Sequence, residues 1–326
     1  MLRPRLSDAA FFYETDLKTP LAQRLAQLDR IVFQQQLGTV ADKSKRVAVL
    51  ASELASSAGA DPQLAQRAGE LCKADLVTDM VLEFSDMQGI AGAYYARHDG
   101  EDEAVAEALE QQYWPRFAGD RLPHNPVALC LGLADRLDTL VGIFGIGQAP
   151  TGSKDPFALR RASLAVLRIV VENEIDLDLR QAIELAQAQY EPGLLEQGTG
   201  DAVFNYMIER FRAWFEDEGI AVEIFKAVSA LELGQPLDIQ RRVHAVNAFS
   251  ALPEADALAA ANKRVSNILS KAGAETIATE VSPDLLQQAE EKALYEQLSL
   301  TASEARRSAN GSFDPVGACP IPKMPT

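Results

Sequence analysis

Cysteine is scarce in this sequence, and its placement excludes two kinds of stabilised fold. The chain has three cysteines, Cys72, Cys130 and Cys319, and their wide spacing fits neither a disulfide framework nor a CxxC zinc site. Long apolar runs are also missing, because no stretch approaches the ~18 to 20 residues that span a bilayer. The N-terminus lacks the apolar segment of a signal peptide. We therefore expect a cytoplasmic protein with no membrane partner.

Histidine is equally rare, which argues against a zinc hydrolase. His98, His124 and His244 are the three histidines, and none of them stands in an HxxxH or HExxH pair that could bring two imidazoles to one metal. The chain also lacks a GxxxxGK[ST] loop, a GxGxxG turn before a helix and a GxSxG elbow. The common phosphate-loop and serine-hydrolase sites are therefore excluded.

What the sequence does contain favours helices. Aromatic residues make up 7% of its 326 residues, alanine, leucine, glutamate and glutamine are abundant, and no convincing pair of alternating strands occurs. Apolar spacing and helix start signals predict helices over 19–38, 42–59, 61–75 and 129–144. The length corresponds to about two domains, and we predict an all-α fold.

Charge is unevenly distributed along the chain. Its 31 basic and 47 acidic residues give a net charge of −16, which alone would argue against a nucleic-acid partner. The acidic excess lies in 172–223, with a net charge of −10, and in 98–120, with −6. By contrast, 151–170 and 241–271 each carry +3. These basic stretches are either binding surfaces on an acidic body or ordinary solvated helix faces.

Carboxylates stand on two helices that are otherwise largely apolar. The apolar spacing of one helix continues to Asp75, and Asp135 and Asp138 lie on another. Residues 133–137 resemble the segment that carries the last metal-binding aspartate of the His-Asp (HD) phosphohydrolase superfamily. Where that superfamily has its His-Asp dipeptide, this chain has Lys73, whose ammonium group would repel a cation. We therefore expect degenerate positions that bind no metal.

The stretch 151–161 is a flexible loop followed by a helix with basic first turns. It brings Lys154 close to a helix start that presents Arg160 and Arg161, and Arg168 follows on the same stripe. Such an arrangement suits a phosphate or an acidic partner near positive backbone dipoles. An ordinary capped helix with surface arginines would have the same sequence.

Several different short motifs follow one another along roughly the first 300 residues. They are Arg3–Ala9, Phe11-Phe12, Leu37-Gly38, Asp42-Lys43, Lys73–Thr78, Met87–Gly89, Leu133–Gly142, Gly152–Arg161 and Ala261–Leu269. In this order they resemble the β subunit of the bacterial tetrameric glycyl-tRNA synthetase. The resemblance implies a chain shortened at both ends relative to that subunit.

The resemblance implies a domain organisation and a role. Residues 1–18 would end a preceding N-terminal domain, 19–235 would form a degenerate HD-like helical domain, and 236–307 would begin a helical anticodon-binding domain. A tail unlike the family, 308–326, is expected to be disordered. In that family the α subunit uses ATP and glycine, whereas the β subunit binds tRNA and is required for charging. The implied partners are therefore the α subunit and glycine tRNA, with no cofactor and no catalytic residue in this chain.

Basic residues are the candidates for RNA contacts. We expect them near RNA phosphates or the anticodon, and they are Lys154, Arg160, Arg161, Arg168, Arg241, Arg242, Lys263, Arg264 and Lys271. Two other functions stay open from the sequence. One is a metal-dependent phosphohydrolase acting at Asp75 and Asp135, and the other is a helical scaffold that contacts the catalytic partner but no RNA.

Overall fold

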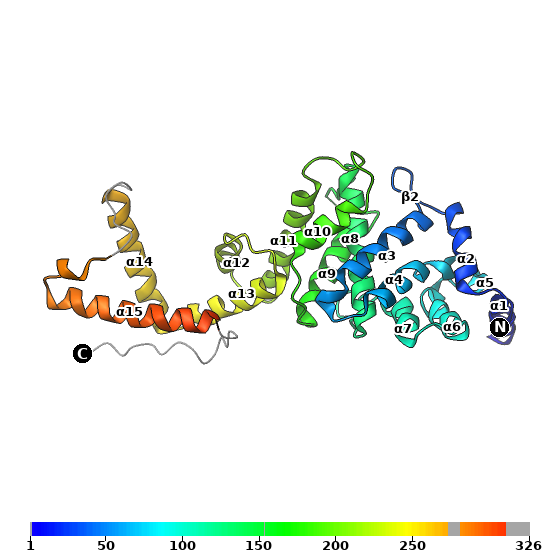
Figure 1. Ribbon diagram of the computed structural model, residues 1–326, viewed down its shortest axis with the longest axis horizontal. Coiled ribbons are helices and arrows are strands. Elements are labelled where there is room, and N and C mark those ends of the chain that lie inside the picture. The colour runs from blue at the N-terminus through cyan, green and yellow to red at the C-terminus, as the bar shows by residue number, and fades with distance from the viewer. Residues whose placement is uncertain (1, 153, 273–280, 311–326) are drawn as a thin grey trace. The chain divides into compact units, whose positions relative to one another are not determined.

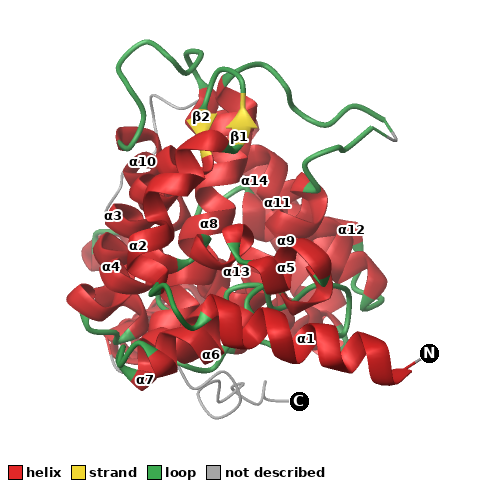
Figure 2. Cartoon of the chain, turned by 90° about the vertical axis from the view of Figure 1, so that its right-hand side faces the viewer, coloured by secondary structure: helices red, strands yellow, loops and turns green. Residues whose placement is uncertain are grey.

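The protein is almost entirely helical. The structure, a computed structural model, describes residues 2–152, 154–272 and 281–310. Within these ranges the strands are limited to a short antiparallel pair, β1 (Val32–Gln34) and β2 (Gly38–Thr39), as Figure 2 shows. The all-α prediction is confirmed. None of the helices in the described ranges has the length and apolar character needed to cross a membrane.

The chain divides into two compact units at Gln240 and Arg241. The helices of the first unit are α1 (Leu2–Asp16), α2 (Leu21–Arg24), α3 (Val40–Ala58), α4 (Pro62–Leu71), α5 (Asp79–Glu83), α6 (Ile90–His98), α7 (Glu103–Gln111), α8 (Pro126–Gly145), α9 (Leu159–Glu172), α10 (Leu179–Ala188), α11 (Thr199–Asp217) and α12 (Val222–Ser229). Short 3₁₀ segments are η1 (Leu25–Arg30), η2 (Ala74–Val77) and η3 (Ser85–Met87). Helix α13 (Pro236–Ser250) spans the division, and α14 (Pro253–Ala272), η5 (Pro283–Leu285) and α15 (Ala289–Asn310) follow.

Helix α8 is the centre of the first unit. It begins where the Asn125 side chain accepts a hydrogen bond from the Val127 N–H, 2.9 Å away, with Pro126 in the first turn. Most of its residues are apolar and buried, so the helix is surrounded instead of lying on a surface. Helices α3, α7, α9, α10 and α11 pack against it (Figure 1). Its carboxylates therefore lie close to the core.

Helix α3 packs tightly between its neighbours. A reciprocal capping box between Thr39 and Asp42 starts the helix, and Gly59 in the left-handed conformation ends it. Against α4, a Cβ placed on Gly69 would lie 2.3 Å from the Ala48 Cα. The two backbones thus approach more closely than any larger residue allows. Helix α3 also packs directly against α8.

The prediction of one helix over 19–38 is wrong beyond the first turns of that range. The chain forms α2, continues as the 3₁₀ segment η1, and then turns through β1 and β2. Leu21 and Leu28 are buried as the spacing indicates, but Val32 is 64% exposed. The spacing counted Val32 as part of a helical face, whereas this β-branched residue begins a strand.

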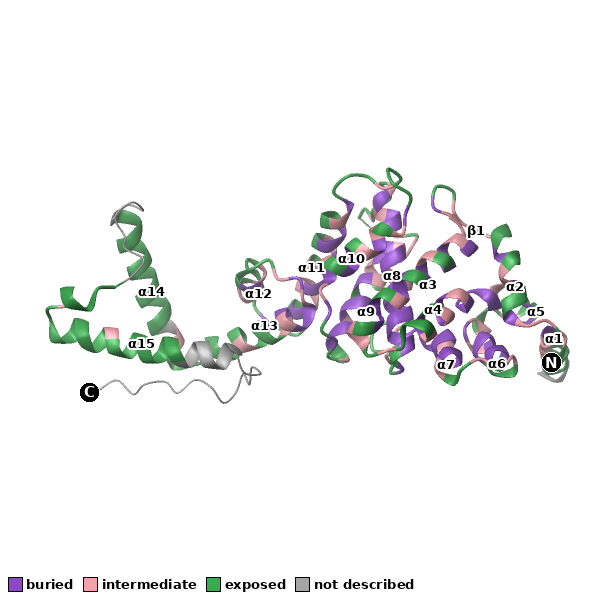
Figure 3. Cartoon of the chain, viewed as in Figure 1, coloured by how far each residue is buried: buried purple, intermediate pink, exposed green. Residues whose placement is uncertain are grey.

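The second unit differs from the first in burial. Helices α14 and α15 consist almost entirely of exposed residues in Figure 3, whereas the helices up to α11 contain many buried ones. Helices α13 and α14 are separated by a short break at Ala251-Leu252, directly before Pro253. Most of the tail predicted to be disordered, 311–326, lies outside the described residues, whereas 308–310 belong to α15.

Candidate functional site

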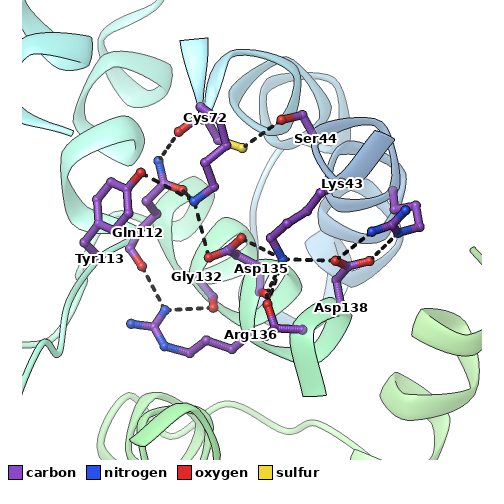
Figure 4. Close-up of polar contacts among 12 residues, drawn as sticks. Lys43, Ser44, Cys72, Gln112, Tyr113, Gly132, Asp135, Arg136 and Asp138 are labelled. Carbon is purple, nitrogen blue, oxygen red and sulfur yellow. Dashed lines mark hydrogen bonds and ion pairs between the residues drawn. The ribbon is translucent and has the colours of Figure 1, made fainter. Parts of the chain in front are cut away.

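Two lysines hold the carboxylate of Asp135. Lys43, from the first turn of α3, places its Nζ 3.1 Å from Asp135 Oδ1 (Figure 4). Lys73, just after α4, places its Nζ 3.3 Å from Oδ2. Both lysines are buried. Each oxygen that could ligate a metal therefore faces an ammonium group. Together with Asp138 and Arg46, these residues form what we call the acidic centre.

The opposite charges of Asp135 and Lys73 each favour the ionised form of the other group. Burial alone would raise the pKa of Asp135, but the nearby charges of Lys43 and Lys73 outweigh burial and hold that pKa well below its usual range. Burial would likewise lower the pKa of Lys73, yet the Asp135 carboxylate outweighs it and raises that pKa. Asp135 and Lys73 are therefore both charged at neutral pH. In the part of the chain that the structure describes, no group of three or more His, Cys, Asp or Glu side chains could hold a metal ion.

Asp138 forms the second half of the acidic centre. Its carboxylate accepts hydrogen bonds from Arg46 Nε at 2.7 Å and Lys43 Nζ at 3.0 Å, and the Tyr190 hydroxyl lies 3.0 Å from its Oδ1. A Cβ on Gly142 would lie 2.3 Å from the Tyr190 hydroxyl oxygen. The tyrosine thus reaches α8 only because this position is glycine. The polar contacts of Asp138 join α3, α8 and the end of α10.

Lys73 also contacts the segment after α7. Its Nζ donates to Gln112 Oε1 at 3.1 Å and lies 3.4 Å from the Tyr113 hydroxyl. Arg136, the residue after Asp135, donates from Nη1 to the Gln112 carbonyl at 2.8 Å and from Nη2 to the Trp114 carbonyl at 3.0 Å. These bonds fix the loop that leads from α7 toward α8.

Asp75 is held separately from Asp135. It lies in η2, not on a continued α4, and its Oδ2 accepts a hydrogen bond from the Gly89 N–H at 2.6 Å. Burial raises the pKa of Asp75 despite this bond. The apolar spacing that continues to Asp75 agrees with its burial, but η2 and not the predicted helix places it there. Backbone N–H groups hold the carboxylate of Asp75, whereas two ammonium groups hold that of Asp135, and the charge of Lys73 acts on both.

A cavity of about 610 Å³ adjoins the acidic centre. Its lining includes two carboxylates, Asp86 and Asp135, together with Arg116, Arg136 and Arg161. Because Asp135 is already paired with two lysines, the arginines dominate the charge of this lining. The cavity is thus better suited to an anion than to a cation.

The predicted basic residues of the first unit gather around the start of α9. Lys154 and Arg161 are exposed, and Arg160 donates to the Gly152 carbonyl. Arg168 pairs with Glu172 at 2.6 Å and donates to the Asp120 carbonyl at 3.2 Å. Helix α9 begins at Leu159, because the Asp155 carboxylate accepts the N–H groups of Leu159 at 2.8 Å and Arg160 at 3.0 Å.

The predicted basic residues of the second unit all lie on helices. Their side chains are exposed: Arg241 and Arg242 on α13, and Lys263, Arg264 and Lys271 on α14. Contacts of these residues with RNA stay predictions.

Sequence reasoning missed Lys43 and Arg46 as members of the acidic centre. The signal was present, because Lys43 occupies the same helical stripe as Val40, Val47 and Leu50, all of which are buried. A lysine on an apolar stripe needs a buried carboxylate, and Asp135 and Asp138 supply it. Sequence reasoning also did not place Arg116, Arg210 and Trp214 beside the arginines of α9. They come close to α9 only through the tertiary fold.

Comparison with known proteins identifies the family. Residues 1–230 match a family model described as glycyl-tRNA synthetase beta subunit. The chain is 60% identical over 271 residues to the glycine–tRNA ligase beta subunit of Chromohalobacter salexigens, covering 83% of this chain and 39% of that protein. Its identity to the beta subunit of Actinobacillus pleuropneumoniae is 54% over 314 residues, covering 96% of this chain and 45% of that protein.

A third relative gives the same result. The glycine–tRNA ligase beta subunit of Mannheimia succiniciproducens is 54% identical over 317 residues, which cover 97% of this chain and 46% of that protein. The chain thus spans less than half the length of these curated relatives. The matched residues 1–230 include the whole acidic centre and the arginines of α9. The chain therefore belongs to the glycyl-tRNA synthetase beta subunit family.

Proposed function

We propose that this chain acts as part of the β subunit of glycine tRNA ligase, where it binds glycine tRNA and supports glycyl-tRNA formation by the α subunit in the cytoplasm. The family match over residues 1–230 carries this proposal. The α subunit would use ATP and glycine, and this chain would supply surfaces for RNA and for assembly.

The geometry of the acidic centre favours this function over a phosphohydrolase. A metal-dependent hydrolase needs a carboxylate that is open to a divalent cation. Here the ammonium groups of Lys43 and Lys73 lie 3.1 and 3.3 Å from the two oxygens of Asp135. A cation would have to displace both lysines against their charge. We therefore propose that the acidic centre is structural.

The distribution of charge supports RNA binding by restricted surfaces. The chain carries a net charge of −16, so an RNA backbone would be repelled by most of its acidic surface. The exposed basic residues at the start of α9 and on α13 and α14 offer favourable contacts. Each phosphate that they neutralise should steepen the salt dependence of binding by ~0.7 to 0.9 log units per log unit of salt concentration.

A salt titration of glycine tRNA binding tests the proposal. The test variant combines five substitutions: Lys154→Ala, Arg160→Ala, Arg161→Ala, Arg241→Ala and Arg242→Ala. The control combines Arg97→Ala with Arg212→Ala, whose guanidinium groups pair with neighbouring glutamates. We expect the test variant to bind more weakly with a shallower slope, and the control to bind like the parent chain.

Two results would contradict this function. Immeasurable affinity for glycine tRNA at low salt would exclude RNA binding, and co-purification with the α subunit would then favour the scaffold function. Manganese-dependent phosphate release that Asp135→Ala abolishes would instead establish the phosphohydrolase.

A further inference from the structure

A second cavity, of about 540 Å³, lies in the first unit among the loop 115–119, α9 and α11. Five arginines line it, and we call it the arginine groove: Arg116, Arg160, Arg161, Arg168 and Arg210. Its volume falls within the ~300 to 1,000 Å³ of small-ligand pockets. A double helix is too wide for such a space, whereas a single nucleotide fits.

The arginine groove carries excess positive charge on an acidic protein. Two carboxylates, Glu172 and Asp217, line it beside the five arginines, and Glu172 is already paired with Arg168 at 2.6 Å. Arg116 and Arg161 form no ion pair with any carboxylate in the described residues, nor does Arg210. The groove therefore offers positive charge to an anion from another molecule, because the described residues leave three of its arginines without a carboxylate partner.

Two buried donors in the arginine groove lack hydrogen-bond partners. Arg168 Nη1 and Arg210 Nε are both shielded from solvent, and neither has an acceptor among the described residues. Buried N–H groups are nearly always paired in folded proteins. Both atoms belong to arginines that line the groove, but neither is exposed to the space that a ligand would occupy, so it is the unpaired charge of Arg116 and Arg161 that the groove offers to an anion.

The groove also offers flat and apolar surfaces. Leu164 and Trp214 line it, with the indole of Trp214 partly exposed and its Nε1 donating to Glu218 at 2.6 Å. Phe117, which is 64% exposed, lies at its rim in the loop. Aromatic rings beside arginines are the usual means of binding single-stranded nucleic acid, because bases stack on the rings and phosphates meet the guanidinium groups. A lone phosphate would not use the apolar surface.

The arginine groove adjoins the cavity beside Asp135. Pro115, Arg116 and Arg161 line both. An RNA strand with one base in the groove could therefore continue along a second basic cavity. Because both cavities lie on the first unit, this path does not depend on the basic residues of α13 and α14.

We propose that the arginine groove binds one unstacked nucleotide of a single-stranded RNA segment. The base lies against Trp214 and Leu164, and its phosphate contacts Arg116 and Arg161. This inference rests on the proposed RNA-binding function and specifies which structural state of the RNA this site takes.

Fluorescence titration with a short RNA tests the inference on the intact chain. Trp214 is one of two tryptophans, and the other, Trp114, is buried. We expect a single-stranded hexanucleotide to quench the emission of Trp214, and its blunt duplex to do so far less. Arg161→Glu and Leu164→Asp should each weaken binding of the single strand at least about fivefold.

Matched variants separate binding from misfolding. Trp214→Phe retains an aromatic ring for the core and should remove most of the quenching. Arg212→Glu is the charge control, because Arg212 lies on α11 two residues from Trp214, pairs with Glu216 at 2.6 Å and does not line the groove. The Arg212→Glu variant should bind the single strand with an affinity within about twofold of that of the parent chain.

The possible contrary results differ from those that test the proposed function. Equal binding of single strand and duplex, or no effect of Arg161→Glu and Leu164→Asp, would overturn the groove proposal. Competition by polyglutamate as effective as that by single-stranded RNA would also overturn it, in favour of an acidic peptide. If glycine tRNA still binds with a steep salt dependence in any of these cases, the proposed function stands without the groove.

Discussion

The acidic centre and the arginine groove lie in the same unit but use charge differently. In the acidic centre, Asp135 and Asp138 meet Lys43, Lys73 and Arg46 at 2.7 to 3.3 Å, in a largely buried setting. In the arginine groove, the guanidinium groups outnumber the carboxylates. The first arrangement satisfies its charges internally, and the second leaves charge for a ligand.

This difference predicts which substitutions affect folding and which affect binding. Removing one partner from a buried ion pair leaves an uncompensated charge in a poorly solvated place. Removing a guanidinium group that has no carboxylate partner leaves no such charge. Stability measurements should therefore separate the two regions even before any ligand is added.

The largest loss of stability is expected for Lys43→Met. The substitution leaves Asp135 with one lysine and Asp138 with Arg46, so part of the buried negative charge becomes unpaired. We expect the free energy of unfolding to fall by ~3 kcal/mol, measured by urea denaturation. The control is Lys45→Met, two residues away with a side chain 74% exposed, which should change it by less than ~0.5 kcal/mol.

A double substitution sharpens this prediction. If Lys43 acts through the carboxylate, Asp135→Asn should recover part of the loss in the Lys43→Met background, so the two changes should not add. Additive losses would mean that Lys43 contributes by filling space and not by its charge.

A smaller loss is expected for Tyr190→Phe. The tyrosine hydroxyl lies 2.8 Å from the Asp138 carbonyl oxygen and 3.0 Å from Oδ1. Its removal should lower the free energy of unfolding by ~1.5 kcal/mol, because the bond involves a charged group. Tyr94→Phe, at a tyrosine that is 55% exposed, should have almost no effect on the free energy of unfolding measured by urea denaturation. Equal effects of the two changes would argue against Asp138 as the partner.

The two buried carboxylates should respond to acid in opposite directions. The folded-state pKa of Asp135 lies below its ordinary value of 3.8, so its contribution to stability is present at neutral pH and is lost as pH falls below about 4. The pKa of Asp75 is raised by burial, so protonation of Asp75 favours the folded state as pH falls.

Denaturation measured from pH 7 to pH 3 distinguishes these contributions. Asp135→Asn should flatten the acid-induced loss of stability, because the residue that loses its ion pairs is gone. Asp75→Asn should steepen the loss instead, because it removes the group whose protonation opposes that loss. The same change in slope for both variants would contradict the different environments of the two carboxylates.

How much of the acidic centre could be predicted from sequence depended on distance along the chain. The carboxylate of Asp135 on an apolar helix, and Lys73 as a repelling group, follow from local patterns. The partnership of Lys43 with Asp135 does not, because 92 residues separate them and α3 must first pack on α8. The all-α fold followed from helix periodicity, but 19–38 shows that spacing alone does not distinguish a helix from a 3₁₀ turn and a hairpin.

The arginine groove was predictable only in part, for the same reason. Arg160, Arg161 and Arg168 share one helix, and the stripe of Arg161 and Arg168 can be read from spacing. Arg116 and Trp214 reach the groove from a loop and from α11. Motif reasoning therefore found the basic side of the groove but not its aromatic platform.

The smallest effect on stability, and the sharpest contrast with Lys43, is expected for Arg161→Ala. Arg161 is exposed and has no ion pair in the described residues, so its removal should change the free energy of unfolding by less than ~0.5 kcal/mol. If it contacts a phosphate, the same variant should reduce the salt slope of glycine tRNA binding by ~0.7 to 0.9 log units. Lys43→Met, measured where both variants remain folded, should leave that slope unchanged, because its charge is used inside the protein. A reversed pattern, with Lys43 governing the slope and Arg161 the stability, would mean that the buried pairs are the binding charges and that the groove is part of the fold.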